Sequence, residues 1–349
     1  MLSGSKVLVT GHTGFKGSWL VGLLQASGVE VVGVSNFVRS SSLYAKIGEE
    51  FEVEEHFCDI RNAKELNRIV KQVNADGIFH LAAQPLVLES YEVPLETFET
   101  NIMGTANIIL SAYQAPKTKF IVVVTTDKVY KNDNLGRSFS EEDHLGGHDP
   151  YSASKAAAEI ITNSLRNFPN REINFPIVTA RAGNVIGGGD DSENRLLPDI
   201  VRSILAHESV LVRNPDSTRP WQHVLDPLSG YLRIADQLLK GEAIANSYNF
   251  GPKTESELSV LEVCKIAISC WEHPSGFRVI GGDRSSQVEA KFLALDSSRA
   301  RKDLGWSSKL TSSEAILWTM EWEKRFHQTS SSAFELTREQ IFNYSALKN

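Results

Sequence analysis

Short apolar segments alternate with helical patterns through the first half of the chain. Residues 7–10, 29–34, 78–82 and 119–125 each form a mostly apolar run that is rich in valine, isoleucine or leucine. Strands that are apolar at nearly every position are typical of a parallel sheet that is covered by helices on both faces. The pattern therefore predicts an α/β fold built on a doubly wound parallel sheet.

The regular alternation weakens after about residue 180. Residues 187–191 read Gly-Gly-Gly-Asp-Asp and predict a loop, and the helices and short strands that follow lack a repeating order. We predict one domain at residues 1–180 and a smaller mixed α/β domain at 181–349, with segments near 219–250 returning to the first. The stretch from about Thr329 onward is expected to form a surface extension or tail.

Composition and charge narrow the class of protein. The 349 residues include 36 Lys and Arg against 43 Asp and Glu, which leaves a net charge of −7. Because proteins that grip nucleic acid concentrate basic residues, we expect no nucleic-acid partner. No apolar run is long enough for a signal peptide or a membrane helix, and the three cysteines are too few for a disulfide framework. We therefore expect a cytoplasmic protein without a membrane segment.

A glycine-rich segment joins the first predicted strand to the first predicted helix. Gly11, Gly14 and Gly17 follow the spacing G-x-x-G-x-x-G, with Thr13 and Phe15 between them. Glycines at these positions allow a tight turn and let backbone N–H groups approach a pyrophosphate at the positive end of the helix. A turn that binds nothing is the alternative, but the place in the first βα connection favours a dinucleotide site. Residues 1–180 are therefore predicted to be a Rossmann domain that binds a dinucleotide.

The segment after the second strand leaves the choice of dinucleotide open. The acidic residue that usually holds the ribose hydroxyls of NAD is missing, since Ser35 and Asn36 stand there with Arg39 close behind. Asn36 suits a ribose hydroxyl and Arg39 suits a 2′-phosphate, so we predict NAD without excluding NADP. Asp59 and Ile60, after a third short strand, are a candidate adenine contact or simply a polar strand end.

Tyr151 and Lys155 are the candidate catalytic pair. Their spacing of four places both on one helix face, where the lysine charge favours the tyrosinate. The same spacing occurs elsewhere, but only here do Asp149 and Pro150 provide a helix N-cap and first turn. The preceding strand ends in Thr-Asp-Lys at 126–128, at the edge of a parallel sheet where ligands bind. A polar loop with a surface ion pair is the alternative for any one of these residues.

Together these motifs resemble the extended short-chain dehydrogenase/reductase family that acts on sugar nucleotides. The resemblance covers about residues 6–325, and its further markers are the segments 80–84 and 181–185 and Asn101. Thr-Asp at the strand end is typical of the 4,6-dehydratases, which carry glutamate where this chain has Lys128. That lysine, with the strings at 11–19 and 219–224, is similar to the branch that acts on CDP-glucose. Segments 87–91 and 288–290 depart from this branch.

The resemblance implies a reaction and a role for each polar group. An NDP-hexose, most of all CDP-D-glucose, would lose water and become the 4-keto-6-deoxy sugar by internal hydride transfer through a bound nicotinamide. Tyr151, supported by Lys155, would remove the 4-hydroxyl proton while Thr126 bonds the same hydroxyl. Asp127 would protonate the departing 6-hydroxyl. Lys128 is expected to be the C5 base or to stabilise the enolate by its charge.

The resemblance and the motifs also imply two binding sets and a homodimer. The cofactor set, besides Tyr151 and Lys155, is Gly11, Thr13, Gly14, Phe15, Gly17, Asn36, Arg39, Asp59, Ile60, Leu81, Ala82 and Ala83. The substrate set is Gln84, Asn184, Arg219, Trp221 and His223. Asn184 and Arg219 are the best diphosphate contacts, since a guanidinium fork suits phosphate oxygens. A surface ion pair is the alternative for Arg219, and a core position is the alternative for the two aromatic residues.

Competing functions remain. A sugar-nucleotide 4-epimerase or reductase explains Tyr151 and Lys155 but leaves Asp127 and Lys128 without a role. A protein that senses the cofactor without catalysis needs none of these groups together. The loop at 141–149 holds several potential metal ligands, but a solvated acidic loop is favoured because no second ligand motif accompanies it. We therefore predict no metal.

Overall fold

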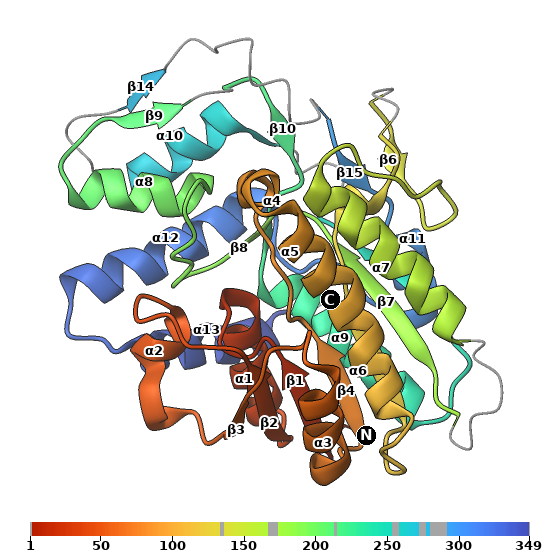
Figure 1. Cartoon of the computed structure of the whole chain (residues 1–349). Coiled ribbons are helices and arrows are strands. Elements are labelled where there is room, and N and C mark those ends of the chain that lie inside the picture. Colours follow the sequence, from red (N-terminus) through yellow and green to blue (C-terminus); the bar gives the residue numbers. More distant parts are fainter. Residues whose placement is uncertain are drawn as a thin grey trace.

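A parallel sheet of seven strands forms the centre of the molecule (Figure 1). The computed structural model describes residues 2–132, 136–166, 174–212, 215–252, 258–271, 277–279 and 292–348. The strand order is β12-β7-β5-β4-β1-β2-β3, and every pairing is parallel. The strands are β1 (Lys6–Thr10), β2 (Glu30–Ser35), β3 (Glu54–Phe57), β4 (Gly77–His80), β5 (Phe120–Val124), β7 (Ile177–Ala182) and β12 (Ser247–Phe250).

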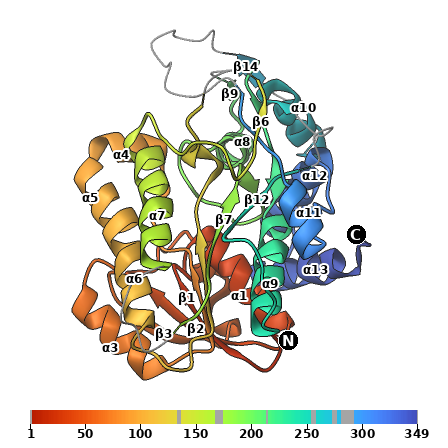
Figure 2. The ribbon, with the colours of Figure 1, turned by 90° about the vertical axis from the view of Figure 1, so that its right-hand side faces the viewer.

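Helices cover both faces of this sheet, as Figure 2 shows. One layer comprises α3 (Ala63–Val73), α4 (Val87–Glu92), α5 (Pro94–Phe98), α6 (Gly104–Ala112) and α7 (Pro150–Arg166). The other contains α1 (Phe15–Ala26), α9 (Leu225–Leu239) and α13 (Ala333–Ala346). Along β1, Val7 and Val9 join the core under the second layer, whereas Leu8 joins the core under the first. The predicted doubly wound α/β fold is confirmed, because alternate positions of an apolar strand feed two separate cores.

A smaller unit with its own apolar core comes mainly from the second half of the chain (Figure 1). Its core packs α8 (Leu196–Leu205), α10 (Val260–Trp271) and α12 (Ser312–Gln328) around residues such as Ile200, Val263 and Ile316. Between α8 and α10 the chain passes back through the large sheet, where it supplies α9 and the edge strand β12.

The remaining elements are short. The short strands are β6 (Ser138–Phe139), β8 (Val185–Ile186), β9 (Val210–Val212), β10 (Thr218–Arg219), β11 (Gln222–His223), β13 (Leu258–Ser259), β14 (Phe277–Val279) and β15 (Ala294–Leu295). The short helices are α2 (Leu43–Ile47) and α11 (Ser298–Leu304), with single turns at Gly48–Glu50, Glu99–Met103 and Asp127–Val129. The strand β8 pairs with β11, which brings segments 185–186 and 222–223 together near the end of the large sheet.

The expectation of a surface tail after Thr329 is wrong. Ser332 caps α13, where its hydroxyl accepts the Glu335 N–H and the Glu335 side chain accepts the Ser332 N–H. Leu336, Ile341 and Tyr344 of this helix are buried in the core under α1 and α9. The serine run, which suggests a mobile tail by composition, therefore marks a helix start.

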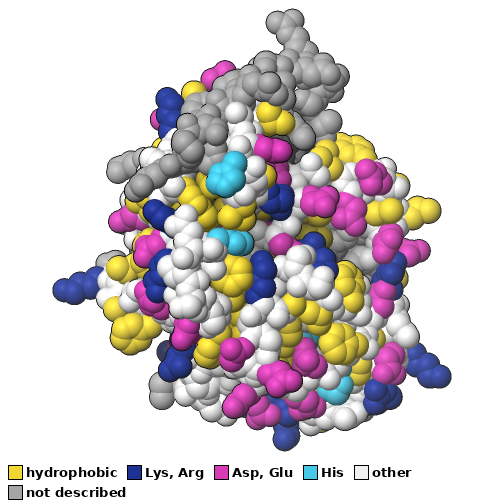
Figure 3. All heavy atoms as spheres, turned by 90° about the vertical axis from the view of Figure 1, so that its left-hand side faces the viewer, with side chains coloured by type: hydrophobic (Ala, Val, Ile, Leu, Met, Phe, Trp, Pro, Cys, Tyr) yellow, Lys and Arg dark blue, Asp and Glu magenta, His cyan; other side chains and the backbone are white. Residues whose placement is uncertain are grey.

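Charges of both signs are mixed on the surface. On the face drawn in Figure 3, basic and acidic side chains both occur, scattered among apolar and uncharged ones. Within the described ranges, no helix combines the length and the apolar character that crossing a bilayer requires. An anionic ligand must therefore find its cations at individual positions, since neither the net charge of −7 nor this surface supplies a broad positive field.

Candidate active site

The glycine turn after β1 is closed tightly on its neighbours. Gly11 has a φ of +74°, and a Cβ built there would come within 2.7 Å of the Ala82 nitrogen after β4. A Cβ on Gly17 would lie 2.0 Å from the Gly11 carbonyl oxygen. The N-cap residue of α1 is Gly14, which has no side chain to cap the helix, so the first N–H groups of α1 are left for another acceptor. This arrangement fits the pyrophosphate of a dinucleotide.

The segment after β2 is fixed to the glycine turn by Thr13. The Thr13 N–H donates to the Ser35 hydroxyl at 3.3 Å, and the Thr13 hydroxyl donates to the Phe37 carbonyl at 2.9 Å. Asn36, between these contacts, is exposed. Arg39 is also exposed and pairs with Asp191 at 2.5 Å. The predicted ribose contacts therefore lie beside the turn, as a dinucleotide site requires.

The other predicted cofactor contacts follow β3 and β4. Asp59 forms an ion pair with Arg61 at 2.6 Å, and the charge and hydrogen bonds of that arginine hold the pKa of Asp59 below its usual value. Ile60 is buried against Gly104. The residues after β4, Leu81, Ala82 and Ala83, are half-buried along the same edge of the sheet. Phe15 is half-buried at the start of α1 and packs against the apolar core that lies under α1, α9 and α13.

Thr126, Asp127 and Tyr151 meet beyond the end of β5. The Thr126 hydroxyl donates to Asp127 Oδ1 at 2.9 Å, and a side-chain hydrogen bond also joins Thr126 to Tyr151. Asp127 is only 2% exposed, and its Oδ2 has no hydrogen-bond partner among the described residues. A buried carboxylate oxygen without a partner is costly to maintain, so it points to a ligand group that completes it.

Burial shifts the acidity of all three titratable groups at this point. It raises the pKa of Tyr151 to about 12, although the hydrogen bond between Tyr151 and Thr126 and the charge of Arg195 oppose that shift. It lowers the pKa of Lys155 to about 8, against the opposing charge of Glu159. It also raises the pKa of Asp127, while the charge of Lys128 pulls it down. A carboxyl group with a raised pKa and a lysine with a pKa of about 8 suit proton transfer.

The start of α7 fixes Tyr151 and Lys155. Asp149 accepts the Ser152 N–H at 2.8 Å, which confirms the N-cap predicted from the sequence. The Tyr151 N–H donates to the Ser90 hydroxyl of α4 at 3.1 Å, and Lys155 Nζ donates to the Val124 carbonyl of β5 at 3.3 Å. Helix α7 is therefore tied both to the end of strand β5 and to α4, a helix of its own layer.

Two of the predicted substrate contacts, Arg219 and Asn184, belong to segments that approach Asp127. Arg219 is buried, and its charge lowers the pKa of Asp127. A Cβ on Gly183, directly before Asn184, would come within 3.0 Å of Asp127 Oδ2. The structure thus brings two of the predicted substrate contacts close to Asp127, the predicted acid. Lys128 is the next residue in the same turn, and its side chain is half-buried.

The other predicted substrate contacts have internal partners. Both polar atoms of the Gln84 amide bond to the backbone of Leu86. Trp221 is buried and donates from its ring nitrogen to the Leu258 carbonyl at 3.3 Å. His223 is fully buried, and burial lowers its pKa to about 3. In this structure these side chains hold backbone or pack in the core, and their substrate contact stays a prediction.

Two cations in the site escaped the sequence analysis. Lys16 of α1 reaches Tyr231 of α9, with 3.5 Å between Nζ and the hydroxyl. Burial lowers the pKa of Lys16 to about 7, helped by the charges of Arg195 and Lys155 and opposed by Asp127. Lys16 stands among the spacer residues of the glycine motif, and Arg195 ends a polar loop. The one signal for Lys16 was a charge at the start of an otherwise apolar helix.

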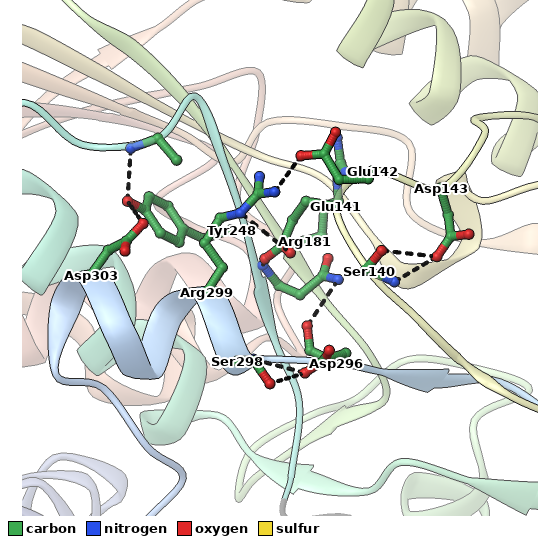
Figure 4. Close-up of polar contacts among 12 residues, drawn as sticks. Ser140, Glu141, Glu142, Asp143, Arg181, Tyr248, Asp296, Ser298, Arg299 and Asp303 are labelled. Atoms are coloured by element: carbon green, nitrogen blue, oxygen red, sulfur yellow. Dashed lines mark hydrogen bonds and ion pairs between the residues drawn. The ribbon is translucent and has the colours of Figure 1, made fainter.

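The acidic loop after β6 is part of a network of ion pairs (Figure 4). Glu141 accepts the Asn249 N–H at 2.7 Å, and Arg299 of α11 pairs with both Glu141 and Glu142. Asp143 accepts the N–H of nearby Ser140 at 2.7 Å. In the ranges that the structure describes, no group of three or more His, Cys, Asp or Glu side chains is arranged to hold a metal ion. Residues 288–290, the second departure noted in the sequence, lie outside the described residues.

The fold and the site together define an extended short-chain dehydrogenase/reductase, with a glycine turn for a dinucleotide and a Thr-Tyr-Lys constellation at the sheet edge. The chain belongs to the GDP-mannose 4,6-dehydratase family, whose sequence profile matches residues 8–320. The resemblance that the sequence motifs indicated is thereby confirmed.

Individual relatives include both dehydratases and epimerases. CDP-glucose 4,6-dehydratase of Salmonella typhimurium is 38% identical over 328 residues, which cover 92% of this chain and 91% of that protein. An epimerase structure from Methanothermobacter thermautotrophicus is 26% identical, with a TM-score of 0.82, over 97% of this chain and 95% of that one. UDP-glucose 4-epimerase from Bifidobacterium longum, solved with NAD+ and UDP, is 25% identical, with a TM-score of 0.77, over 92% and 98%.

Proposed function

We propose that the protein is an NAD-dependent CDP-glucose 4,6-dehydratase, which converts CDP-D-glucose to CDP-4-keto-6-deoxy-D-glucose and water. The likeness to the Salmonella enzyme supports this substrate. One observation in the structure carries the reaction type: Asp127 is buried, holds Thr126 with one oxygen, and has its other oxygen without a partner among the described residues. A 4-epimerase needs no acid at this point, whereas elimination of the 6-hydroxyl does.

The glycine turn and the uncapped start of α1 are the parts of this chain that would hold NAD. Bound there, NAD would supply the hydride chemistry, taking the hydride from C4 and returning it to C6. The dinucleotide must then stay bound through the whole reaction, because the net change is the loss of water. The cytoplasm is the proposed location, and synthesis of deoxysugars for polysaccharides is the proposed use of the product.

Tyr151 and Thr126 would act on the 4-hydroxyl of the sugar. The tyrosinate accepts the hydroxyl proton, and Thr126, already bonded to Tyr151, orients the same oxygen. Lys155, one turn further along α7 and fixed to the Val124 carbonyl, places a positive charge that favours the tyrosinate. The charge of a bound oxidised nicotinamide would lower the pKa of Tyr151 in the same direction.

Asp127 and Lys128 would carry out the elimination. The 4-keto group acidifies the C5 proton, so a base at C5 and an acid at the 6-hydroxyl together expel water. Burial raises the pKa of Asp127, which favours the protonated form that the leaving hydroxyl needs. Lys128, in the same turn, is the residue we assign to C5, either as the base or as the charge that stabilises the enolate.

Replacing Lys128 with methionine tests the assignment at C5. We expect Lys128→Met to reduce deuterium incorporation at C5 from heavy water by about 10²-fold or more, since one general base typically contributes that factor. The measurement is mass spectrometry of the product formed in deuterated buffer. Lys131→Met, a change of the same kind three residues away and near the surface, serves as the control. Undiminished C5 exchange in Lys128→Met would contradict the base assignment.

The proposed function as a whole is tested by turnover. The purified protein with NAD is incubated with CDP-, dTDP-, GDP- and UDP-hexoses, and the products are examined by mass spectrometry. We expect CDP-glucose to lose one water. An unchanged mass with a new epimer would identify a 4-epimerase instead, and bound cofactor without turnover of any sugar nucleotide would identify a sensing protein.

We also propose a homodimer that forms through the helix layer of α4 to α7. Figure 1 shows these helices side by side. Large apolar side chains are exposed on them and on the turn between α5 and α6, namely Tyr91, Leu95, Met103, Leu110 and Ile160. An apolar area on neighbouring helices is typical of a protein interface. We expect the double variant Leu95→Lys, Ile160→Lys to be monomeric by sedimentation equilibrium, while Phe342→Lys on α13 stays dimeric. A monomeric wild-type protein at micromolar concentration would contradict the proposal.

A further inference from the structure

The end of β2 lacks the carboxylate that a dinucleotide site for NAD usually places there. Ser35 and Asn36 occupy the position, and Arg39 follows. In the folded chain, however, a carboxylate from the second half of the sequence contacts the segment that follows, at Arg39 and Ser41. Asp191, in the loop between β8 and α8, accepts a hydrogen bond from Arg39 on Oδ1 and one from Ser41 on Oδ2, each at 2.5 Å.

The position of Asp191 is fixed by its loop. The Gly189 N–H donates to Glu323 of α12 at 2.7 Å, and a Cβ on Gly189 would lie 2.6 Å from the Leu43 side chain of α2. The loop that carries Asp191 is therefore packed between α12 of the smaller unit and α2, the helix that begins shortly after Ser41. On the other side, Thr13 binds the segment after β2 to the glycine turn.

The combined charge of Arg39, Ser41 and Asp191 bears on whether a plain ribose or a ribose 2′-phosphate binds beside them. Arg39 and Ser41 are the donors that would bind a 2′-phosphate, but Asp191 already neutralises the guanidinium and occupies the hydroxyl. The Asp191 side chain is only 12% exposed, so its charge is less screened than that of an ordinary surface group. A phosphate dianion beside it would meet like charge. A ribose diol would meet carboxylate oxygens, each of which has a further acceptor position.

We propose that Asp191 is the residue that selects NAD over NADP, by supplying across the fold the carboxylate that β2 lacks. The proposal rests on the function proposed above, because it concerns the dinucleotide of the same site. It also means that the loop carrying Asp191 links the cofactor end of the molecule to the unit that holds the substrate.

Substitution of Asp191 by asparagine tests the proposal through binding. We expect Asp191→Asn to lower the Kd for NADP by at least about tenfold, because Arg39 then pairs with the phosphate, and to raise the Kd for NAD by a few-fold. Both constants are measured by calorimetric titration of protein freed of cofactor, and the thermal shift with each dinucleotide gives a second readout. In the double variant Asp191→Asn, Arg39→Met, the gain in NADP affinity is expected to disappear.

Asp199→Asn is the matched control, because it removes the same unit of charge from an exposed pair, Asp199 with Arg202, on the outer face of α8. It is expected to leave the ratio of the two Kd values unchanged. The proposal is overturned if Asp191→Asn leaves that ratio at the wild-type value, or if NADP affinity rises equally without Arg39. Turnover of CDP-glucose by the wild-type protein with NAD separates these results from failure of the proposed function, which would show as no turnover with either dinucleotide.

Discussion

Tyr151→Phe is expected to reduce kcat for dehydration of CDP-glucose by about 10²–10⁴-fold, the range that a positioned general base contributes. The substitution removes only the hydroxyl that Thr126 holds and leaves the buried ring in place. Binding of NAD should therefore be nearly unchanged, so that the loss falls on kcat. The measurement is the initial rate at saturating substrate and NAD, together with the Kd for NAD from titration.

Tyr113→Phe is the matched control for this substitution. Tyr113 and Lys117 repeat the spacing of Tyr151 and Lys155, but the Tyr113 hydroxyl donates to the Leu165 carbonyl on the far part of the helix layer. We expect Tyr113→Phe to keep the wild-type rate per folded molecule. If Tyr151→Phe kept more than about a tenth of the wild-type rate, the phenol would not be the base that removes the 4-hydroxyl proton.

The pH dependence of kcat should follow from the same group. Burial raises the pKa of Tyr151 to about 12 in the cofactor-free protein, and the nearby cations must lower it in the complex for the tyrosinate to form. The rate should therefore rise with pH on the acid side, as the phenol loses its proton. That rise should be absent from the residual rate of Tyr151→Phe, and the pH–rate profile measures both.

The doubly wound sheet is predictable from the sequence because four of its strands carry their own signal. The apolar runs that end at Thr10 and Thr125 indicate burial on both faces without any knowledge of their neighbours. The edge strand β12 has four residues and is placed by its register with β7, from Ser247 against Thr179 onward. Two strands that pair over such a sequence distance leave no local pattern from which the pairing could be predicted. The same holds for α13, because nothing in the serine run before it indicates that a packed helix follows.

The site divides in the same way. Tyr151 is identifiable because a local N-cap, Asp149, and a strand end at Thr126 accompany it. Lys16 and Asp191 are not identifiable, because their importance depends on contacts with Tyr231 and Arg39 that only the folded chain provides. Local motifs thus identify the groups that we propose for the chemistry, while charged residues near those groups come from distant segments.

The buried ion pair between Glu159 and Arg181 is expected to be the contact whose loss destabilises the fold most. Glu159 lies one turn beyond Lys155 on α7, and Arg181 lies on β7; two hydrogen bonds of 2.9 Å join them. Thr125 of the strand end also donates to Glu159, at 2.6 Å. Both charged side chains are at most 5% exposed, so removing one charge leaves the other buried without compensation.

We therefore expect Glu159→Gln to lower the free energy of unfolding by about 3–5 kcal/mol at pH 7, as measured by urea denaturation. Glu339→Gln, which breaks the exposed pair with Arg325, should cost about 1 kcal/mol or less. A loss in Glu159→Gln no larger than that of this control would show that the buried pair adds nothing beyond a surface contact.

The pH dependence of this difference has a definite sign. Burial alone would raise the pKa of Glu159, but the hydrogen bonds and charge of Arg181 outweigh it and hold that pKa below the ordinary value of 4.5. A carboxyl group whose pKa is lower in the folded state stabilises the fold fully above its unfolded pKa. The gap in stability between wild type and Glu159→Gln should therefore be constant above about pH 5.5 and shrink as the pH falls below 4.5, where Glu159 of the unfolded chain takes up a proton before that of the folded protein does. A gap that widened on acidification would mean that the carboxylate does not stabilise the helix that carries Lys155.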